Sequence, residues 1–193
     1  MNSKINAFIV ALYKYFKVSF YFWVYLFKGL LVYGLIPATS ALFLTLHYLH
    51  NDKNNNEAEI KKNYKIYYNQ FSNHKVASFL ISFLLILILS ISYYLYVFNS
   101  AITVMLLIVN CYTLALILIT FTYTIYFLTT KEMSMKQSFI FGFVSVIKNL
   151  LRSLLILAIV LLDLYIAYFN LVLFVAVGPV VYGVSTQFIL KKL

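Results

Sequence analysis

The chain has 193 residues, of which 64% are hydrophobic and only 10% are charged, and its mean hydropathy is +0.92. A typical water-soluble domain has about 25% charged residues, so this composition excludes an ordinary soluble fold. The net charge of +10 does not indicate nucleic-acid binding, because the Lys and Arg residues form short clusters between hydrophobic runs. We expect an all-α, polytopic transmembrane helix bundle with about five hydrophobic segments, forming a single membrane domain over residues 1–193.

The N-terminal quarter of the chain has an ambiguous topology. Residues 1–17 predict an interfacial helix, because their short apolar stretch is followed by Lys14 and Lys17 and not by a signal-peptide cleavage site. Residues 18–50 form a hydrophobic segment that we expect to be broken at Pro37, since proline removes a helical hydrogen bond and clashes with the preceding turn. The segment allows about 50 Å of helix, which is short of two full crossings. It is either a re-entrant hairpin with its tip at Pro37 or a single crossing with an outside N-terminus.

The polar segment 51–75 predicts a cytoplasmic loop that contains an amphipathic helix. Residues 57–71 place apolar side chains at helical spacing with lysines on the other side, the apolar set being Ile60, Tyr64, Tyr67, Tyr68 and Phe71. Residues 132–147 are a further candidate for such a surface helix.

Two long apolar runs predict four membrane spans. Residues 76–130 contain no charged residue and no histidine, and as one helix they would measure about 80 Å. The hydrocarbon core of a bilayer is about 30 Å thick, so this run must hold two spans and a turn. Residues 153–190 contain only Asp163 as a charge and are also long enough to cross twice. We expect the spans at residues 76–97, 102–128, 149–167 and 171–190.

The positions of the basic residues predict the orientation of these spans. Lys and Arg cluster before the first apolar run, between the two runs and at the C-terminus, whereas the turns near residues 98–100 and 168–170 are uncharged. Positive charge accumulates in loops that stay on the cytoplasmic side. We therefore expect a multi-pass protein of the cell membrane with a cytoplasmic C-terminus.

Three short motifs resemble those of the YesL-like family, which are bacterial integral membrane proteins of unknown function. The main motif, Gly-Leu-Ile-Pro-Ala-Thr-Ser-Ala-Leu at residues 34–42, contains Gly34, Pro37, Ala38, Thr39 and Ala41. Residues 67–71 and 147–151 fit the same pattern, but family members usually show an Asn and a Leu-Trp pair where this chain has residues 28–31. The resemblance implies an integral membrane protein often encoded beside carbohydrate-uptake transporters, without an established activity.

Lys28 and Asp163 are the opposite charges that fall within the apolar segments. A charge at the centre of a membrane helix costs about 2.5 to 3.5 kcal/mol on insertion scales, so mutual pairing would relieve both residues. The sequence therefore predicts that the two are coupled. One interpretation is a solute or proton site. We prefer the other, in which the two form a structural pair, or Lys28 extends to the membrane interface and Asp163 lies near the outer interface.

A polar stripe is the second candidate for an intramembrane site. Its members fall within about 100° of one helix face and are Thr103, Asn110, Thr113, Thr120 and Thr124. A transport path requires such a face, but so does ordinary helix packing, because these residues hydrogen-bond across helix interfaces in membranes. We prefer the packing interpretation.

The sequence predicts no enzyme and no cofactor. It contains no glycine-rich phosphate loop and no GxSxG, HExxH or CxxC motif. His47 and His50 lack a carboxylate or Cys at ligand spacing, so no metal site is expected. Two hypotheses remain: an accessory subunit in the bilayer that binds a membrane-protein partner, which we prefer, and a small transporter or channel acting alone.

Overall fold

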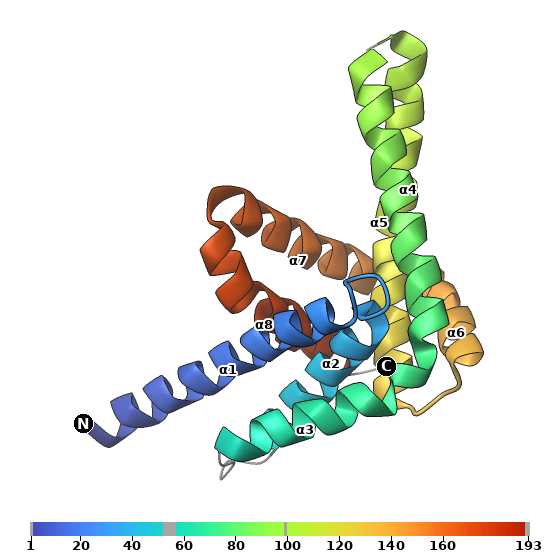
Figure 1. Ribbon diagram of the computed structural model, residues 1–193. Coiled ribbons are helices and arrows are strands. Elements are labelled where there is room, and N and C mark those ends of the chain that lie inside the picture. The colour runs from blue at the N-terminus through green and yellow to red at the C-terminus, as the bar shows by residue number, and fades with distance from the viewer. Residues whose placement is uncertain (1, 52–56, 99, 192–193) are drawn as a thin grey trace.

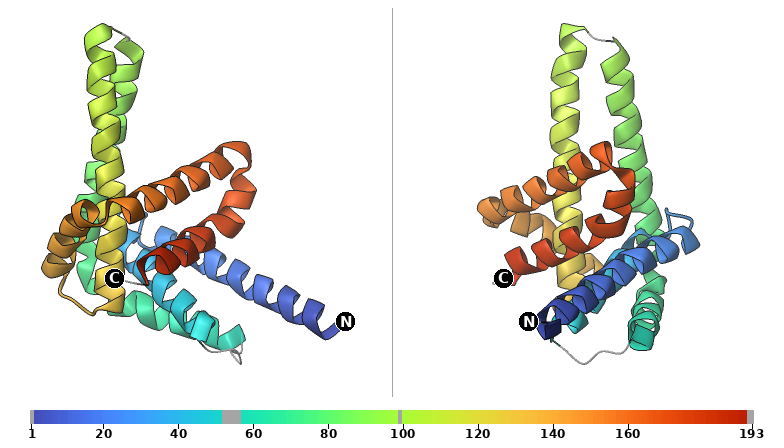
Figure 2. Two further views of the ribbon diagram at one scale, coloured as in Figure 1. Left: turned by 180° about the vertical axis from the view of Figure 1, so that it is seen from behind. Right: turned by 90° about the vertical axis from the view of Figure 1, so that its left-hand side faces the viewer.

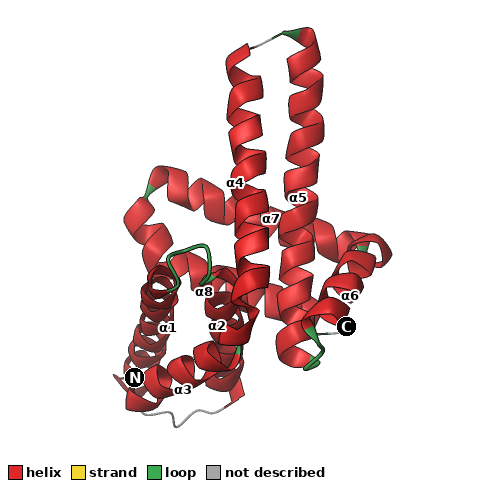
Figure 3. Ribbon diagram, turned by 45° about the vertical axis from the view of Figure 1, so that its right-hand side comes forward, coloured by secondary structure: helices red, strands yellow, loops and turns green. Residues whose placement is uncertain are grey.

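The computed structural model describes residues 2–51, 57–98 and 100–191. Within these ranges the chain forms helices and short turns and no strand, so the predicted all-α class is confirmed (Figures 1 and 3). In chain order the helices are α1 (Asn2–Lys28), α2 (Leu35–Asn51), α3 (Glu57–Gln70), α4 (Lys75–Phe98), α5 (Ala101–Thr130), α6 (Met135–Lys148), α7 (Leu150–Phe169) and α8 (Leu171–Leu190), with one 3₁₀ turn, Ser72–His74, before α4.

Four helices of the described chain are long and apolar enough to cross a membrane, namely α4, α5, α7 and α8. They occupy the two apolar runs from which the spans were predicted. Each run forms a helical hairpin, and the α4–α5 and α7–α8 hairpins leave the base of the fold in different directions (Figures 1 and 2). Polar caps replace charged loops at both tips: the Ser100 hydroxyl accepts from the Thr103 N–H at 3.3 Å, and the Asn170 side chain accepts from the Leu173 N–H at 3.0 Å.

The N-terminal segment differs from its expected division. Helix α1 continues through residue 17 to Lys28, so the surface helix and the next segment are one element. The chain reverses at residues 29–34, and Pro37 lies in the first turn of α2, where its missing N–H removes no helical hydrogen bond. The tip thus precedes Pro37. A re-entrant hairpin requires such a reversal between two helices. That this hairpin enters the bilayer stays a prediction.

The reversal at residues 29–34 is held by a close backbone contact and by α4. A Cβ atom on Gly29 would collide with the Cα of Gly34, so this approach requires glycine. The Ser78 hydroxyl on α4 donates to the Val32 carbonyl at 2.9 Å and accepts from the Ile36 N–H at 3.2 Å. A serine in a membrane helix therefore anchors the start of α2.

Helix α3 follows the predicted amphipathic spacing, but protein covers its apolar face. Ile60 and Tyr64 are fully buried, and α3 packs on α1 and α2. The Tyr64 hydroxyl donates to the Ala38 carbonyl at 2.8 Å. Burial raises the pKa of Tyr64 well above its ordinary value of 10.0, so this hydroxyl keeps its proton and remains a donor. Helix α3 is thus a structural cover for the α1–α2 pair.

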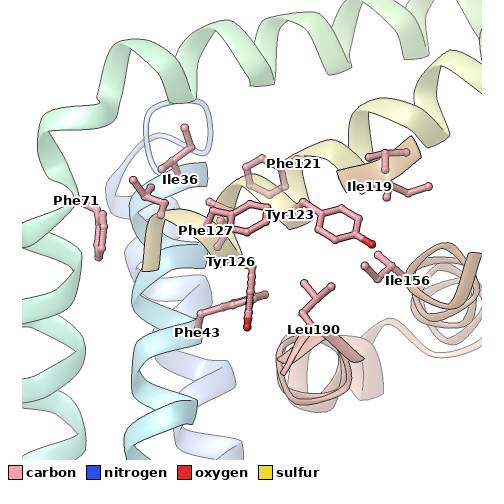
Figure 4. Close-up of a cluster of buried hydrophobic side chains, with 13 residues drawn as sticks. Ile36, Phe43, Phe71, Ile119, Phe121, Tyr123, Tyr126, Phe127, Ile156 and Leu190 are labelled. Carbon is pink, nitrogen blue, oxygen red and sulfur yellow. The ribbon is translucent and has the colours of Figure 1, made fainter. Parts of the chain in front are cut away.

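The C-terminal third of α5 is the centre of the fold. Every residue from 119 to 129 is buried, and this stretch contacts α2, α6, α7 and α8. Tyr126 projects from α5 toward Phe43 of α2, and Tyr123 points toward Ile156 of α7, where its hydroxyl lies 3.4 Å from that of Ser153 (Figure 4). The N-terminal half of α5 packs only on α4 among the described helices, so the α4–α5 hairpin stands out from the core (Figure 1).

Candidate functional site

The predicted intramembrane acid, Asp163, faces the interior. The buried residues of α7 are Ser153, Ile156 and Asp163, whose spacing places them on one helix face, while the neighbouring Leu162 and Leu164 are exposed. Asp163 is only 7% exposed. The sequence therefore directs a carboxyl group toward α8 and the core, and turns leucines toward lipid.

Tyr182 of α8 stands near this carboxyl group and is hydrogen-bonded to Thr122 of α5. The hydroxyl oxygens of Thr122 on α5 and Tyr182 on α8 are 2.8 Å apart. Because Thr122 donates its own proton to the Leu118 carbonyl at 2.9 Å, the Tyr182 hydroxyl is the donor between them. Asp163 lies close enough to Tyr182 to interact with it electrostatically. These residues bring α5, α7 and α8 together around one polar cluster.

One oxygen of the carboxyl group, Asp163 Oδ1, is buried and accepts no hydrogen bond within the described structure. An unsatisfied acceptor in a membrane interior is costly and marks a group that a proton, a cation or an outside donor would stabilise. The arrangement supplies one acid, one phenol and one hydroxyl. It supplies no nucleophile beside a base.

Lys28 does not belong to this cluster. It is the last residue of α1, it is exposed, and its Nζ lies 5.6 Å from the centre of the Tyr25 ring. Helix α1 packs on α2, α3 and α8, whereas Asp163 is on α7, and no ion pair joins these two described residues. The predicted pairing of Lys28 with Asp163 is wrong. The hydropathy pattern shows that a charged residue lies within an apolar segment. It does not show which other helix packs against the face that carries this residue.

The polar stripe of α5 is used in local hydrogen bonds. Asn110 donates to the Ile88 carbonyl at 3.0 Å and to the Ser92 hydroxyl at 2.6 Å, which ties α5 to α4. The other bonds stay within α5 or its cap: Thr103 with Ser100, Thr113 to the Val109 carbonyl, and Thr124 to the carbonyl of the buried Thr120. The stripe thus runs from the exposed tip of the hairpin to the buried core and does not line one continuous path.

The residues of the proline motif form a structural junction. A Cβ on Gly34 would lie 2.8 Å from the Leu26 carbonyl oxygen, Ala38 and Ala41 are fully buried, and Thr39 donates to the Leu35 carbonyl at 2.6 Å. Small side chains at these positions let α1, α3 and α4 approach the beginning of α2. The motif therefore builds the turn and its supports.

A cavity with several polar residues in its lining, at the base of the fold, was not predicted. It has a volume of about 460 Å³ and is lined by α1, α2, α5, α8 and the residues that follow α5 and α8. The polar lining residues include His47, His50, Glu132, Gln187 and Lys191. Its residues come from four helices, so no sequence pattern shows them as a set. No group of three or more His, Cys, Asp or Glu side chains suited to a metal occurs in the described ranges.

A second, larger groove lies between α4, α5 and α6. Its volume is about 730 Å³, and nearly all of its lining is apolar. The only charged residue in the lining is Lys136, in the first turn of α6. Residues 132–147 were predicted as a candidate surface helix, but the sequence did not show that α4 and α5 form the other walls of a groove beside it.

Comparison with known proteins adds no further assignment. No family profile, curated protein or solved structure matches the chain. The resemblance to the YesL-like family stays a prediction. The chain is an all-α membrane protein with four candidate spans among the described helices.

Proposed function

We propose that this chain is an accessory membrane subunit, which binds another membrane protein through its apolar hairpins. The observation on which the proposal rests is the open arrangement of those hairpins. Helix α4 and the N-terminal half of α5 pack on each other, and the α7–α8 hairpin leaves the core in another direction (Figure 2). A lone small transporter would enclose a site between its spans.

The polar side chains of α5 are engaged in hydrogen bonds within the protein, which supports the same proposal. Asn110 and the threonines of α5 bond to backbone carbonyls or to neighbouring side chains, so few polar groups remain to bind a solute. The large groove beside α5 is apolar. A transporter requires a water-accessible site near the midplane of the membrane, where several polar groups converge on the solute. Few polar side chains of this chain are left to form such a site.

Site-directed photocrosslinking tests the proposal in native membranes. A photoreactive residue at Met105, which is 72% exposed on α5, should give a defined adduct with one membrane protein. The matched control is Asn110 on the same helix, which faces α4 and should crosslink within the chain. Adducts with lipid alone at Met105, and again at Leu161 on the other hairpin, would refute the proposal.

The sequence suggests which kind of protein the partner is and on which side of the membrane the bases of the hairpins lie. The family resemblance suggests a carbohydrate-uptake transporter of a bacterial cell membrane, and the lysine clusters suggest that the bases of both hairpins face the cytoplasm. The second candidate, a stand-alone transporter or channel, is favoured by one observation, the unsatisfied buried oxygen of Asp163. Saturable uptake by the purified protein in liposomes, lost on Asp163→Asn, would establish that candidate in place of the first.

A further inference from the structure

The apolar groove between α4, α5 and α6 extends over most of the depth of one lipid leaflet. Its walls extend over residues 77–84 of α4 and 113–121 of α5. At about 1.5 Å per residue these stretches are about 10 and 12 Å long. Half of a hydrocarbon core of about 30 Å is about 15 Å. An acyl chain lying along the groove would therefore pass through most of one leaflet.

The charged end of the groove is at the base of the α4–α5 hairpin. Helix α6 follows α5 after the short turn at residues 131–134, so its first turn, with Lys136, lies where α5 ends and α4 begins (Figure 1). Lys75 is the first residue of α4, and Lys131 and Glu132 follow α5. Three lysines against one glutamate leave this end positive. The opposite end of the groove, at Leu84 and Thr113, is uncharged.

Helix α6 is fixed in its place beside the groove. A Cβ on Gly142 would lie 2.7 Å from the Thr124 hydroxyl and 3.1 Å from the Thr124 backbone nitrogen, so α6 meets α5 in close contact. The aromatic side chains of Phe139 and Phe143 on α6 then stand beside the apolar walls and remain about half exposed. The groove is a preformed feature of the packed helices.

We propose that this groove binds one anionic phospholipid, with an acyl chain along α4 and α5 and the headgroup phosphate at Lys136. The occupant is a lipid because the site combines an apolar wall that extends over most of one leaflet with a cationic end at the level where a headgroup lies. It is anionic because the base carries excess positive charge. This lipid site is independent of the protein partner proposed above.

Native mass spectrometry of the purified protein tests the site with two defined lipids. The protein is titrated with phosphatidylglycerol and with phosphatidylcholine of identical acyl chains. We expect one phosphatidylglycerol to be retained in preference to phosphatidylcholine. Lys136→Gln should lower its retention about fivefold, the effect of one lysine near an anionic lipid surface. Lys148→Gln, at the other end of the same helix, is the matched control and should leave retention within about twofold.

Two further measurements separate this site from general lipid contact. Ala77→Trp should obstruct the α4 wall of the groove and lower retention, and size-exclusion chromatography checks that this variant is folded. A photoreactive residue at Leu80 should crosslink to phospholipid in native membranes. Equal retention of the two lipids, equal effects of Lys136→Gln and Lys148→Gln, or a protein adduct at Leu80 would each overturn the proposal; the lysine pair decides the outcome if Ala77→Trp does not fold.

Discussion

Replacement of Tyr64 by phenylalanine measures how firmly α3 is attached to the α1–α2 pair. The tyrosine side chain is 0% exposed, and its hydroxyl donates to the Ala38 carbonyl at 2.8 Å. Tyr64→Phe keeps the ring and removes only this bond. Because Ala38 lies inside α2, its carbonyl still accepts the helical N–H from four residues ahead. We therefore expect a loss of about 1 kcal/mol, the ordinary net value of one hydrogen bond.

Tyr64→Ala removes the ring as well and should cost about 3 to 5 kcal/mol, as for other buried aromatic side chains. For a chain of this length 1 kcal/mol corresponds to roughly 2 to 4 °C in Tm, so we expect decreases of about 3 °C for the phenylalanine and about 10 °C for the alanine. The only tryptophan, Trp23, donates to the Val175 carbonyl at 3.0 Å, so its fluorescence follows the separation of α1 from α8 on heating.

The matched control for both substitutions is Tyr67, which is half-buried on the same helix. Tyr67→Phe should leave Tm unchanged within about 1 °C, and Tyr67→Ala should cost about 1 kcal/mol, the typical effect of a point mutation. If Tyr64→Ala lowers Tm no more than Tyr67→Ala, then α3 is not packed on the N-terminal helices and the reasoning is refuted.

Three other predictions follow from the contacts described above. Gly142→Val should separate α6 from α5 and destabilise the fold by about 1 to 3 kcal/mol, as overpacking does, and an unchanged Tm would contradict the close crossing. Lys28→Met and Asp163→Leu should be additive within about 0.5 kcal/mol, because the residues form no pair; a double mutant more stable than the sum would restore the pairing. A cysteine at Ser134 should be protected from an impermeant reagent in intact cells while one at Ser100 reacts, and the reverse would invert the proposed orientation.

The spans and the helical class were predictable because they depend on composition over long windows. A run without charge from residue 76 to 130 admits two membrane helices and little else, and the structure has α4 and α5 there. The break near Pro37 was expected for the same local reason, although the turn itself lies at residues 29–34. The local sequence predicts that the helix is broken in this region. The exact position of the break depends on tertiary contacts, here the close backbone approach of Gly29 to Gly34.

The surroundings of single side chains were not predictable, because they depend on which helices meet. Thr113 and Thr124 belong to the same face of one helix, yet Thr113 is exposed and Thr124 is fully buried. The difference arises because α6, α7 and α8 cover only one end of α5. Likewise, Asp163 was recognised as an intramembrane acid, but its neighbour Tyr182 is on another helix and no spacing rule connects them.

The neutral tips at Ser100 and Asn170 bear on how the chain enters a bilayer during synthesis. Each hairpin has its basic residues at its base, and only a short uncharged turn has to traverse the hydrocarbon. Moving a lysine through the centre of a membrane helix costs about 2.5 to 3.5 kcal/mol on insertion scales. Neither hairpin incurs that cost at its tip, so each can insert as a unit, α4–α5 before α7–α8, without waiting for the rest of the fold.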